Sequence, residues 1–277
     1  QVLTTDGSGA VTFADAGGGG ADLYAAETTG STDPTASGTR SIAIGSSASS
    51  TGTQSIAIGE SATASGLYSV SIGSGTTDNT NDFSVAVGYF SRSSGEDATA
   101  LGRSSKADGL RSTALGYNAD ANGSYSLAVG KGSLGYGSYS ISIGADTQAN
   151  YNYSTALGHN SSGQFSRADA AGSIALNGSR TGGTDSFAAA IANNTSSYGA
   201  TGANSVAIGE LAKASGTDAI CIGASSTASG SQSFAAGFGH NAGSARSVVL
   251  GYQSSATSTG AIAIGNSCSS SQGYAVS

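Results

Sequence analysis

The chain has 277 residues, of which 44 are Gly and one is Pro, and it contains neither Met nor Trp. Collagen also uses much Gly, but it needs Gly at every third position together with abundant Pro, so this composition excludes a collagen helix. The net charge is −7 and only 10% of the residues are charged, which disfavours nucleic acid or an anionic membrane as a partner. No apolar run approaches about 18 residues, so we expect no membrane-embedded segment.

The first forty residues lack the pattern that governs the rest of the chain. Two short apolar stretches flank Asp6-Gly7, a dipeptide typical of hairpin turns, so we expect a small β-hairpin within residues 1–16. The run Gly17–Gly20 that follows is typical of a flexible linker. The sequence therefore predicts a hairpin-like module with its Gly-rich linker at 1–20, a linker or cap at 21–40, and a repeat domain at 41–277.

A fourteen-residue unit of the form S-I-A-I-G-x-x-A-x-A-x-G-x-x begins sixteen times from Ser41 onward, and Ala275–Ser277 matches the start of a seventeenth. A short fixed period is the signature of a solenoid, in which each coil packs on its two neighbours. Positions two and four of the unit are aliphatic, whereas positions one, three and five are small, which predicts a strand. The second half alternates around paired alanines, and Gly ends each half, so we expect two strands and two turns per coil.

This alternation places a large-residue face and a small-residue face on the first strand of each coil. We expect the aliphatic side chains to fill the core, where they would meet the alanines of the opposite wall. The small face at positions one, three and five would then admit other subunits, and three-fold closure suits a fibre. Cys221 lies on that face and could approach its symmetry mates, whereas Cys221 and Cys268, roughly 14 Å apart along the stack, should not pair within one chain.

Two units are longer than the rest by five residues, and insertions in a solenoid form loops that often lie on a binding face. These units, 154–172 and 186–204, bracket a unit of thirteen residues. The candidate binding residues in their loops are His159, Gln164, Phe165, Arg167, Asn193, Asn194 and Tyr198. The alternative is that both insertions are tolerated and bind nothing.

Three consecutive units end in tyrosine, at Tyr125, Tyr139 and Tyr153. Because equivalent residues of neighbouring coils are about 5 Å apart, these rings should form a ladder. Exposed tyrosines could hold sugar rings or another surface through their amphipathic character, and they could equally do no more than stabilise the edge of the rod.

Signals for metal binding or catalysis are weak. Asp78 and Asp82 could bind a cation in the fifteen-residue unit, but no calcium-loop continuation follows, so a solvated loop is favoured. The pattern Gly130-x-Gly132-x-x-Gly135 matches a dinucleotide fingerprint but lies in a β-repeat. The two histidines, His159 and His240, are more than five units apart, and we expect His240 to face the core. We therefore expect no enzyme, no resident metal and no cofactor.

The repeat resembles the head repeats of trimeric autotransporter adhesins of the Yersinia adhesin type. Their S-V-A-I-G-x-x-A-x-A-x-G unit is matched by Ser55–Gly66, Ser112–Gly123 and Ser205–Gly216, and the resemblance covers residues 41–277. It implies a left-handed parallel β-roll, assembled as a parallel homotrimer and used in adhesion at an extracellular surface.

Residues Gln1–Ala16 resemble a small hairpin module of marine bacteriophage tail fibres and other virion proteins. This resemblance implies a virion fibre that attaches to a host cell-surface component such as a glycan. The alternatives are the head of a bacterial adhesin on the outer cell surface, and a passive spacer that holds a binding tip elsewhere.

Overall fold

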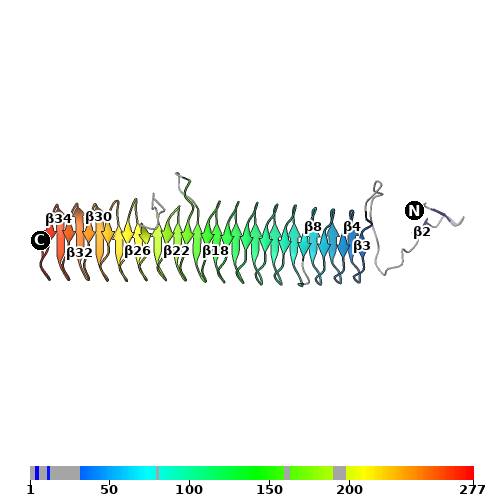
Figure 1. Ribbon diagram of the computed structural model, residues 1–277, viewed down its shortest axis with the longest axis horizontal. Helices are drawn as coiled ribbons and strands as arrows, with labels where there is room; N and C mark the ends of the chain where they lie inside the picture. Colours follow the sequence, from blue (N-terminus) through cyan, green and yellow to red (C-terminus); the bar gives the residue numbers. More distant parts are fainter. Residues whose placement is uncertain (1–3, 6–10, 13–31, 79–80, 159–162, 190–197) are drawn as a thin grey trace.

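The computed structural model describes residues 4–5, 11–12, 32–78, 81–158, 163–189 and 198–277 of the chain. Within these ranges the protein is a parallel β-solenoid without helices, whose coils stack into a long rod (Figure 1). The all-β solenoid that the fourteen-residue period predicts is confirmed.

Each coil contributes one strand to each of two parallel sheets. The first strand of each coil belongs to a 16-stranded sheet in which successive coils are neighbours. Its strands are β4 (Ile42–Ile44), β6 (Ile56–Ile58), β8 (Val70–Ile72), β10 (Val85–Val87), β12 (Thr99–Leu101), β14 (Thr113–Leu115), β16 (Leu127–Val129), β18 (Ile141–Ile143), β20 (Thr155–Leu157), β22 (Ile174–Leu176), β24 (Phe187–Ala189), β26 (Val206–Ile208), β28 (Ile220–Ile222), β30 (Phe234–Phe238), β32 (Val248–Tyr252) and β34 (Ile262–Asn266).

The second strand of each coil is two residues long and pairs with its counterparts in the coils before and after. The strands of this sheet are β3 (Thr35–Ala36), β5 (Ser49–Ser50), β7 (Thr63–Ala64), β9 (Thr77–Asp78), β11 (Arg92–Ser93), β13 (Lys106–Ala107), β15 (Asp120–Ala121), β17 (Leu134–Gly135), β19 (Gln148–Ala149), β21 (Arg167–Ala168), β23 (Arg180–Thr181), β25 (Gly199–Ala200), β27 (Lys213–Ala214), β29 (Thr227–Ala228), β31 (Asn241–Ala242), β33 (Ser255–Ala256) and β35 (Ser269–Ser270).

Near the N-terminus, β1 (Thr4–Thr5) and β2 (Val11–Thr12) pair antiparallel, with Thr4 opposite Thr12. This pairing agrees with the hairpin expected around Asp6-Gly7, although the turn itself lies outside the described residues. The division of the chain at residues 20 and 40 stays a prediction.

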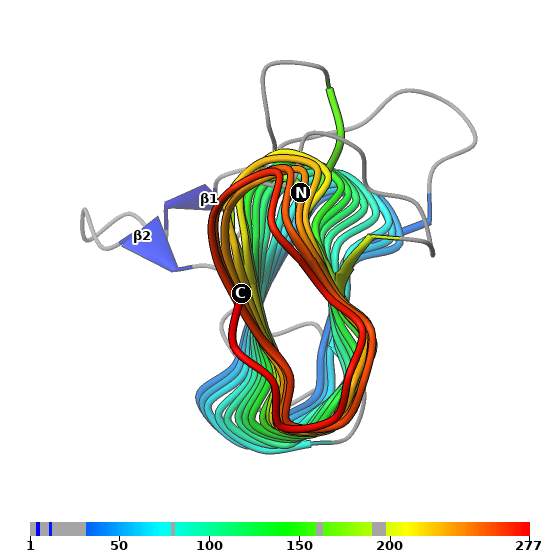
Figure 2. The same cartoon turned by 90° about the vertical axis from the view of Figure 1, so that its left-hand side faces the viewer.

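The coils are stacked in register, so equivalent residues of neighbouring repeats lie side by side. Ala100 of β12 is opposite Ala86 and Ala114, and the backbone N–H of Thr113 donates to the carbonyl of Ser126 at 2.9 Å. Viewed along the rod, the coils superimpose as one flattened loop that turns slowly from end to end (Figure 2). The hydrogen bonds between coils therefore run along the rod.

The expected core is wrong, because the small face points inward and the aliphatic face points outward. Ala43, Ala57 and Ser55, at positions one and three, are fully buried, whereas Ile42 and Ile44 of the same strands are exposed or half-buried. The opposite wall contributes alanines such as Ala64, which are also fully buried. Two short strands closed by two tight turns leave an interior that accommodates small side chains and excludes isoleucine.

In most coils the serine at position one makes a hydrogen bond inside this narrow core. The hydroxyl of Ser55 donates to the carbonyl of Gly52 at 2.7 Å, and that of Ser205 donates to Gly202 at the same distance. In these coils the serine satisfies a carbonyl in the turn before its own strand. The position-one hydroxyls of Ser112, Ser126, Ser140 and Ser233 are buried without a hydrogen-bond partner among the described residues.

The two turns of each coil need glycine for different reasons. At position five, Gly88 has φ +136°, a conformation that side chains rarely adopt. At position twelve, Gly109 has no unusual φ, but a Cβ there would overlap the carbonyl oxygen of Gly123 in the next coil. The left-handed residue of this second turn is the last of the unit, for example Tyr125 with φ 60°.

Cys221 lies inside the coil, fully buried between Ala207 and Ala235 of the adjacent coils. Burial raises the pKa of its thiol to about 11, which keeps it protonated. The expected approach of Cys221 to its symmetry mates is therefore wrong. Cys221 and Cys268 are both free thiols, which confirms that they do not pair within the chain.

His240 is buried as expected, at a position where the neighbouring coils have serine. Its Nδ1 accepts the backbone N–H of Ser254 at 3.2 Å, so its Nε2 carries the proton and donates to the carbonyl of Gly251 at 2.8 Å. In the preceding coil the hydroxyl of Ser226 accepts the N–H of His240 at 3.2 Å. The imidazole thus replaces a serine hydroxyl in a column of side-chain acceptors.

Substituting Gly109→Ala should lower the free energy of unfolding by about 2–3 kcal/mol, because the new methyl group overlaps the backbone of the next coil. Gly182→Ala is the matched control: its Cβ meets only Thr201, at 3.8 Å, and φ is not in the left-handed region. Chemical denaturation followed by circular dichroism checks both variants. Equal losses of stability in the two would contradict this account of the turn.

Candidate functional site

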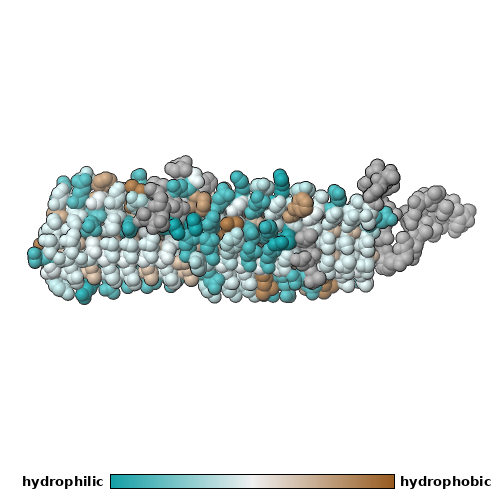
Figure 3. Space-filling view, in the orientation of Figure 1, coloured by the Kyte–Doolittle hydropathy of each residue, from teal (hydrophilic) through white to brown (hydrophobic). Residues whose placement is uncertain are grey.

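The outer surfaces of the two sheets differ in chemistry. The aliphatic wall consists of the outward residues at positions two and four of the even-numbered strands from β4 to β34. The polar wall consists of the outward residue of each odd-numbered strand from β3 to β35 and the residue that follows the strand. Half of the ten basic residues lie on the polar wall, namely Arg92, Lys106, Arg167, Arg180 and Lys213. Hydrophilic side chains gather near mid-length on the face in Figure 3.

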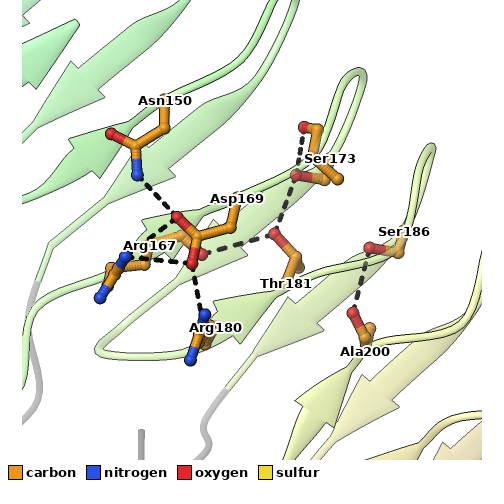
Figure 4. A network of polar contacts seen from close by, with 9 residues as sticks. Asn150, Arg167, Asp169, Ser173, Arg180, Thr181, Ser186 and Ala200 are labelled. Atoms are coloured by element: carbon orange, nitrogen blue, oxygen red, sulfur yellow. Dashed lines mark hydrogen bonds and ion pairs between the residues drawn. The ribbon is translucent and has the colours of Figure 1, made fainter. Parts of the chain in front are cut away.

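A cluster of charged residues joins three adjacent coils on the polar wall (Figure 4). Arg167 of β21 and Arg180 of β23 are directly opposite each other, and Asp169 follows β21. The Asp169 carboxylate accepts hydrogen bonds from Arg180 Nε at 2.8 Å, from Arg167 Nη2 at 3.3 Å and from Asn150 Nδ2 at 2.6 Å. The Asp169 side chain is only 12% exposed, so its carboxylate oxygens bind these three side chains and little of the group is accessible to solvent or ligand.

The cluster borders a depression in the surface with a volume of about 530 Å³. Its lining residues come from four coils and are Tyr136, Asn150, Tyr151, Arg167, Asp169, Arg180 and Gly182. Burial raises the pKa of Tyr136, and the nearby Asp120 raises it further, so its hydroxyl stays neutral and can donate a hydrogen bond. The depression therefore combines cationic, amide and phenolic groups.

The local sequence explains why two arginines meet here. The unit beginning at Ser173 lacks one residue in its first turn, at Asn177-Gly178, which leaves its second strand in register. Sequence reasoning named Arg167 but missed Asp169 and Arg180. The available signal was that Arg167 and Arg180 occupy the same position of consecutive units, with Asp169 two residues after the first.

The tyrosine ladder has the expected spacing. The ring centroids of Tyr125 and Tyr139 are 4.8 Å apart and those of Tyr139 and Tyr153 are 5.2 Å apart, with interplanar angles of 1° and 4°. In this parallel stack the faces of the middle ring are covered by its neighbours. The next coil has Gly172 at the equivalent position, so the column supplies no further ring to the second face of Tyr153, which is 64% exposed.

The same column continues toward the N-terminus through charged residues. Arg111 Nε donates to the Asp97 carboxylate at 3.0 Å, and the Arg111 guanidinium lies 5.7 Å from the centre of the Tyr125 ring. Cation–π contact of this kind is stabilising, but only weakly where the cation is exposed to solvent, as Arg111 is. The ladder is thus stabilised along its own axis.

The other sequence-predicted binding residues have separate environments. Gln164 and Phe165 are half-buried and precede Arg167 in the chain, and Tyr198 packs against the alanine core. His159, Asn193 and Asn194 lie outside the described residues. A binding role for any of these residues stays a prediction.

The candidate cation ligands are only partly described. The Asp82 carboxylate accepts the backbone N–H of Leu67 at 2.9 Å, so one of its oxygens stabilises the stack. The side chain of Asp78 lies outside the described part of the structure. Within that part, His, Cys, Asp and Glu side chains form no group of three or more that could hold a metal ion.

The pattern at Gly130 does not have the context of a dinucleotide site. Gly130 and Gly132 lie in the turn between β16 and β17, and Gly135 ends β17. The strand after this turn is short and packs in the solenoid, whereas a dinucleotide fingerprint requires a helix there.

One family model matches the chain, and it is described as the YadA head domain repeat in two copies. The matched residues are 36–59, 50–76, 80–105, 93–119, 107–133, 136–161, 200–224, 214–239 and 242–267, which together cover more than half of the chain. The chain belongs to the YadA head-repeat family. YadA head repeats on a β-solenoid are typical of adhesin-like structural segments at an extracellular surface rather than of enzymes. No curated protein was found to match the chain.

The YadA head-repeat matches leave out residues 162–199, which include Arg167, Asp169 and Arg180. The charged cluster therefore occupies the part of the solenoid where the family pattern is interrupted. Among the described residues no helix is long and apolar enough to span a membrane.

Replacing Asp169→Asn should lower the free energy of unfolding by about 1–2 kcal/mol, because two facing guanidinium groups lose a shared and largely buried counter-charge. Asp97→Asn is the matched control, since the Arg111–Asp97 pair is exposed to solvent and its loss should lower the free energy of unfolding much less. Thermal and chemical denaturation measure both changes. If Asp97→Asn lowers the free energy of unfolding as much as Asp169→Asn does, the buried cluster contributes no more to stability than an exposed ion pair.

Proposed function

We propose that the chain is a non-enzymatic, homotrimeric segment of an extracellular surface fibre that takes part in attachment to a host cell. The single observation that carries the proposal is the aliphatic wall. Along this wall, aliphatic side chains between 38% and 52% exposed recur over the whole rod. They are Ile42, Leu101, Leu115, Ile141, Ile143, Ile174, Ile222 and Ile264.

Exposed aliphatic side chains that recur along one face in this way are typical of a protein–protein interface rather than of a solvated surface. The two outward rows of one coil, for example Ile141 and Ile143, lie on a sheet surface that can pack against the same sheet of another chain. A parallel, in-register arrangement would place equivalent coils at the same height. Closed rotational symmetry would then cover the wall in every subunit.

The small-residue face cannot serve as this interface, because Ser and Ala at positions one and three are inside the coil. The aliphatic wall takes the role that sequence reasoning gave to the small face. Three-fold symmetry is supported by membership of the YadA head-repeat family and by the rod shape.

Two biological settings fit this segment. A bacteriophage tail or virion fibre is supported by the resemblance of Gln1–Ala16 to phage fibre modules and by the antiparallel pairing of β1 with β2. The head of a bacterial trimeric autotransporter adhesin is supported by the family match. In both settings the segment is exposed at an outer surface, and its contacts with the host component, such as a glycan, would be multiplied along three chains.

A passive spacer is the alternative to a binding segment. The groups available for binding are the exposed edge of the Tyr125–Tyr139–Tyr153 ladder, which borders the first strands of its coils, and the cluster at Arg167, which lies on the sheet opposite the aliphatic wall. A spacer would use neither of them.

The wild-type chain should sediment as a particle of about 80 kDa, three times the 26.5 kDa of one chain. The double substitution Leu115→Glu, Ile143→Glu places six carboxylates in the proposed interface of the trimer. The protein concentration at which half of the trimer dissociates should therefore rise at least about 100-fold. The double control Asn122→Glu, Gln148→Glu changes the polar wall of the same two coils and should stay trimeric. A monomeric wild type, or equal behaviour of both variants, would overturn the assembly.

Attachment is tested by incubating the fluorescently labelled trimer with intact bacterial cells and with eukaryotic cells, the host classes that the phage and adhesin settings predict. Saturable binding to one class, abolished by the dissociating double substitution, supports an adhesive segment. Absence of binding to both classes under conditions where the trimer is intact would favour the spacer.

A further inference from the structure

We propose that the depression beside Arg167 and Arg180 is a binding site for a carboxylate-bearing sugar unit, such as a uronic acid. The inference deepens the proposed function, since it names the chemical class of a host-surface glycan that this fibre would recognise. It rests on the charge, the unused donors and the shape of the depression.

The local charge is opposite to that of the chain as a whole. The lining residues include two arginines and one aspartate, so they carry a net charge of about +1 on a chain of net charge −7. Gln148 occupies the equivalent outward position in the preceding strand and Gly199 in the following one, and neither is acidic. The two guanidinium groups make this side of the depression cationic, while Asp120 lies near Tyr136 on the other side.

The arginines have donors left after they bind Asp169. In the hydrogen bonds of the described residues, Arg180 uses only Nε and Arg167 uses only Nη2. The two terminal nitrogens of a guanidinium match the two oxygens of a carboxylate, and such charge-assisted pairs are stronger than neutral hydrogen bonds. Asp169 holds both arginines in place, which reduces the entropy lost when a ligand binds.

The remaining lining groups suit a sugar rather than a bare anion. Tyr136 and Tyr151 are exposed aromatic residues with hydroxyl groups, and Asn150 adds an amide. Tyrosine offers both an apolar ring and a polar hydroxyl, the combination that a sugar ring with its hydroxyl groups requires. The depression is open and shallow, so it would hold one face of a sugar unit rather than enclose it.

The site would also remain open in the proposed assembly. All three strands that carry the cluster, β19, β21 and β23, belong to the sheet opposite the aliphatic wall. A trimer would therefore present three copies at one height along the fibre, and weak single sites would act together on a polymeric glycan.

The test is an NMR titration of the intact chain with glucuronic acid, glucose and acetate at constant ionic strength. Glucuronic acid and glucose differ only at the C6 carboxylate, and acetate supplies the carboxylate without the sugar. We expect glucuronic acid to bind at least about tenfold more tightly than either of the others, with a Kd on the order of millimolar. Equal affinity for glucose would overturn the carboxylate assignment, and equal affinity for acetate would overturn the sugar assignment.

Arg180→Gln should weaken the binding of glucuronic acid at least about tenfold. Arg246→Gln removes the same charge from an exposed position on a distant coil and should leave the affinity unchanged. If Arg180→Gln unfolds, Arg167→Gln tests the same site. Unchanged binding in the folded site variant, or an equal loss in Arg246→Gln, would refute the proposal.

These outcomes are distinguishable from failure of the proposed function. All lining residues come from one chain, so a monomer retains the site and can be titrated. Conversely, a trimer that binds cells but not glucuronic acid would leave the fibre proposal intact and remove this one.

Discussion

The interior of each coil is so narrow that almost only alanine, serine and similarly small side chains fit between the two walls. The largest fully buried side chains are Val249 and a few threonines, in a chain with many isoleucines. Apolar burial within one chain is correspondingly modest, and serine hydroxyls that bond to turn carbonyls occupy part of the space. The larger aliphatic residues have no place inside, so they form the outer surface of the longer sheet. The apolar outer surface of the longer sheet, the exposure of the polar wall and the position of the candidate site all follow from this constraint.

Much of the fold could be predicted from the period alone. Strand positions, both turns and the in-register columns follow from the spacing of Gly and of the aliphatic pairs, as at Ile56 and Ile58. The inner face could not be predicted in the same way, because alternation distinguishes two faces without saying which is enclosed. Side-chain volume decides that question: fourteen residues with two tight turns form a coil too thin for Ile56, whereas Ala57 fits. The prediction that Cys221 lies on an outer face was wrong for the same reason, since its small side chain is enclosed.

A candidate site could be predicted where it consists of equivalent residues in repeats of equal length. It was harder to predict where the repeats contain insertions or deletions. Tyr125, Tyr139 and Tyr153 occupy one position of equal-length units, so their stacking follows from the register. Arg180 and Asp169 lie in units of unequal length, so the equivalence of Arg167 and Arg180 is hidden when positions are counted from the start of each unit and is seen when they are counted from its end. A local excess of positive charge arises there because two consecutive coils place arginine in the same column. Elsewhere on the polar wall, Arg92 is paired with Asp108 and Asp120 follows Lys106 in the column.

The direction of the hydrogen bonds between coils determines how such a fibre responds to force. These bonds lie along the rod, as between Thr113 and Ser126, so tension applied at one end loads the bonds of the last coil first. Each coil is held only by its immediate neighbours, and its detachment leaves the next coil in the same situation. A single chain pulled from its end would therefore peel away coil by coil, dissipating a small amount of work at each step. In the proposed assembly, three chains joined through their aliphatic walls would have to release corresponding coils together, so lateral association would be the source of the fibre's tensile strength.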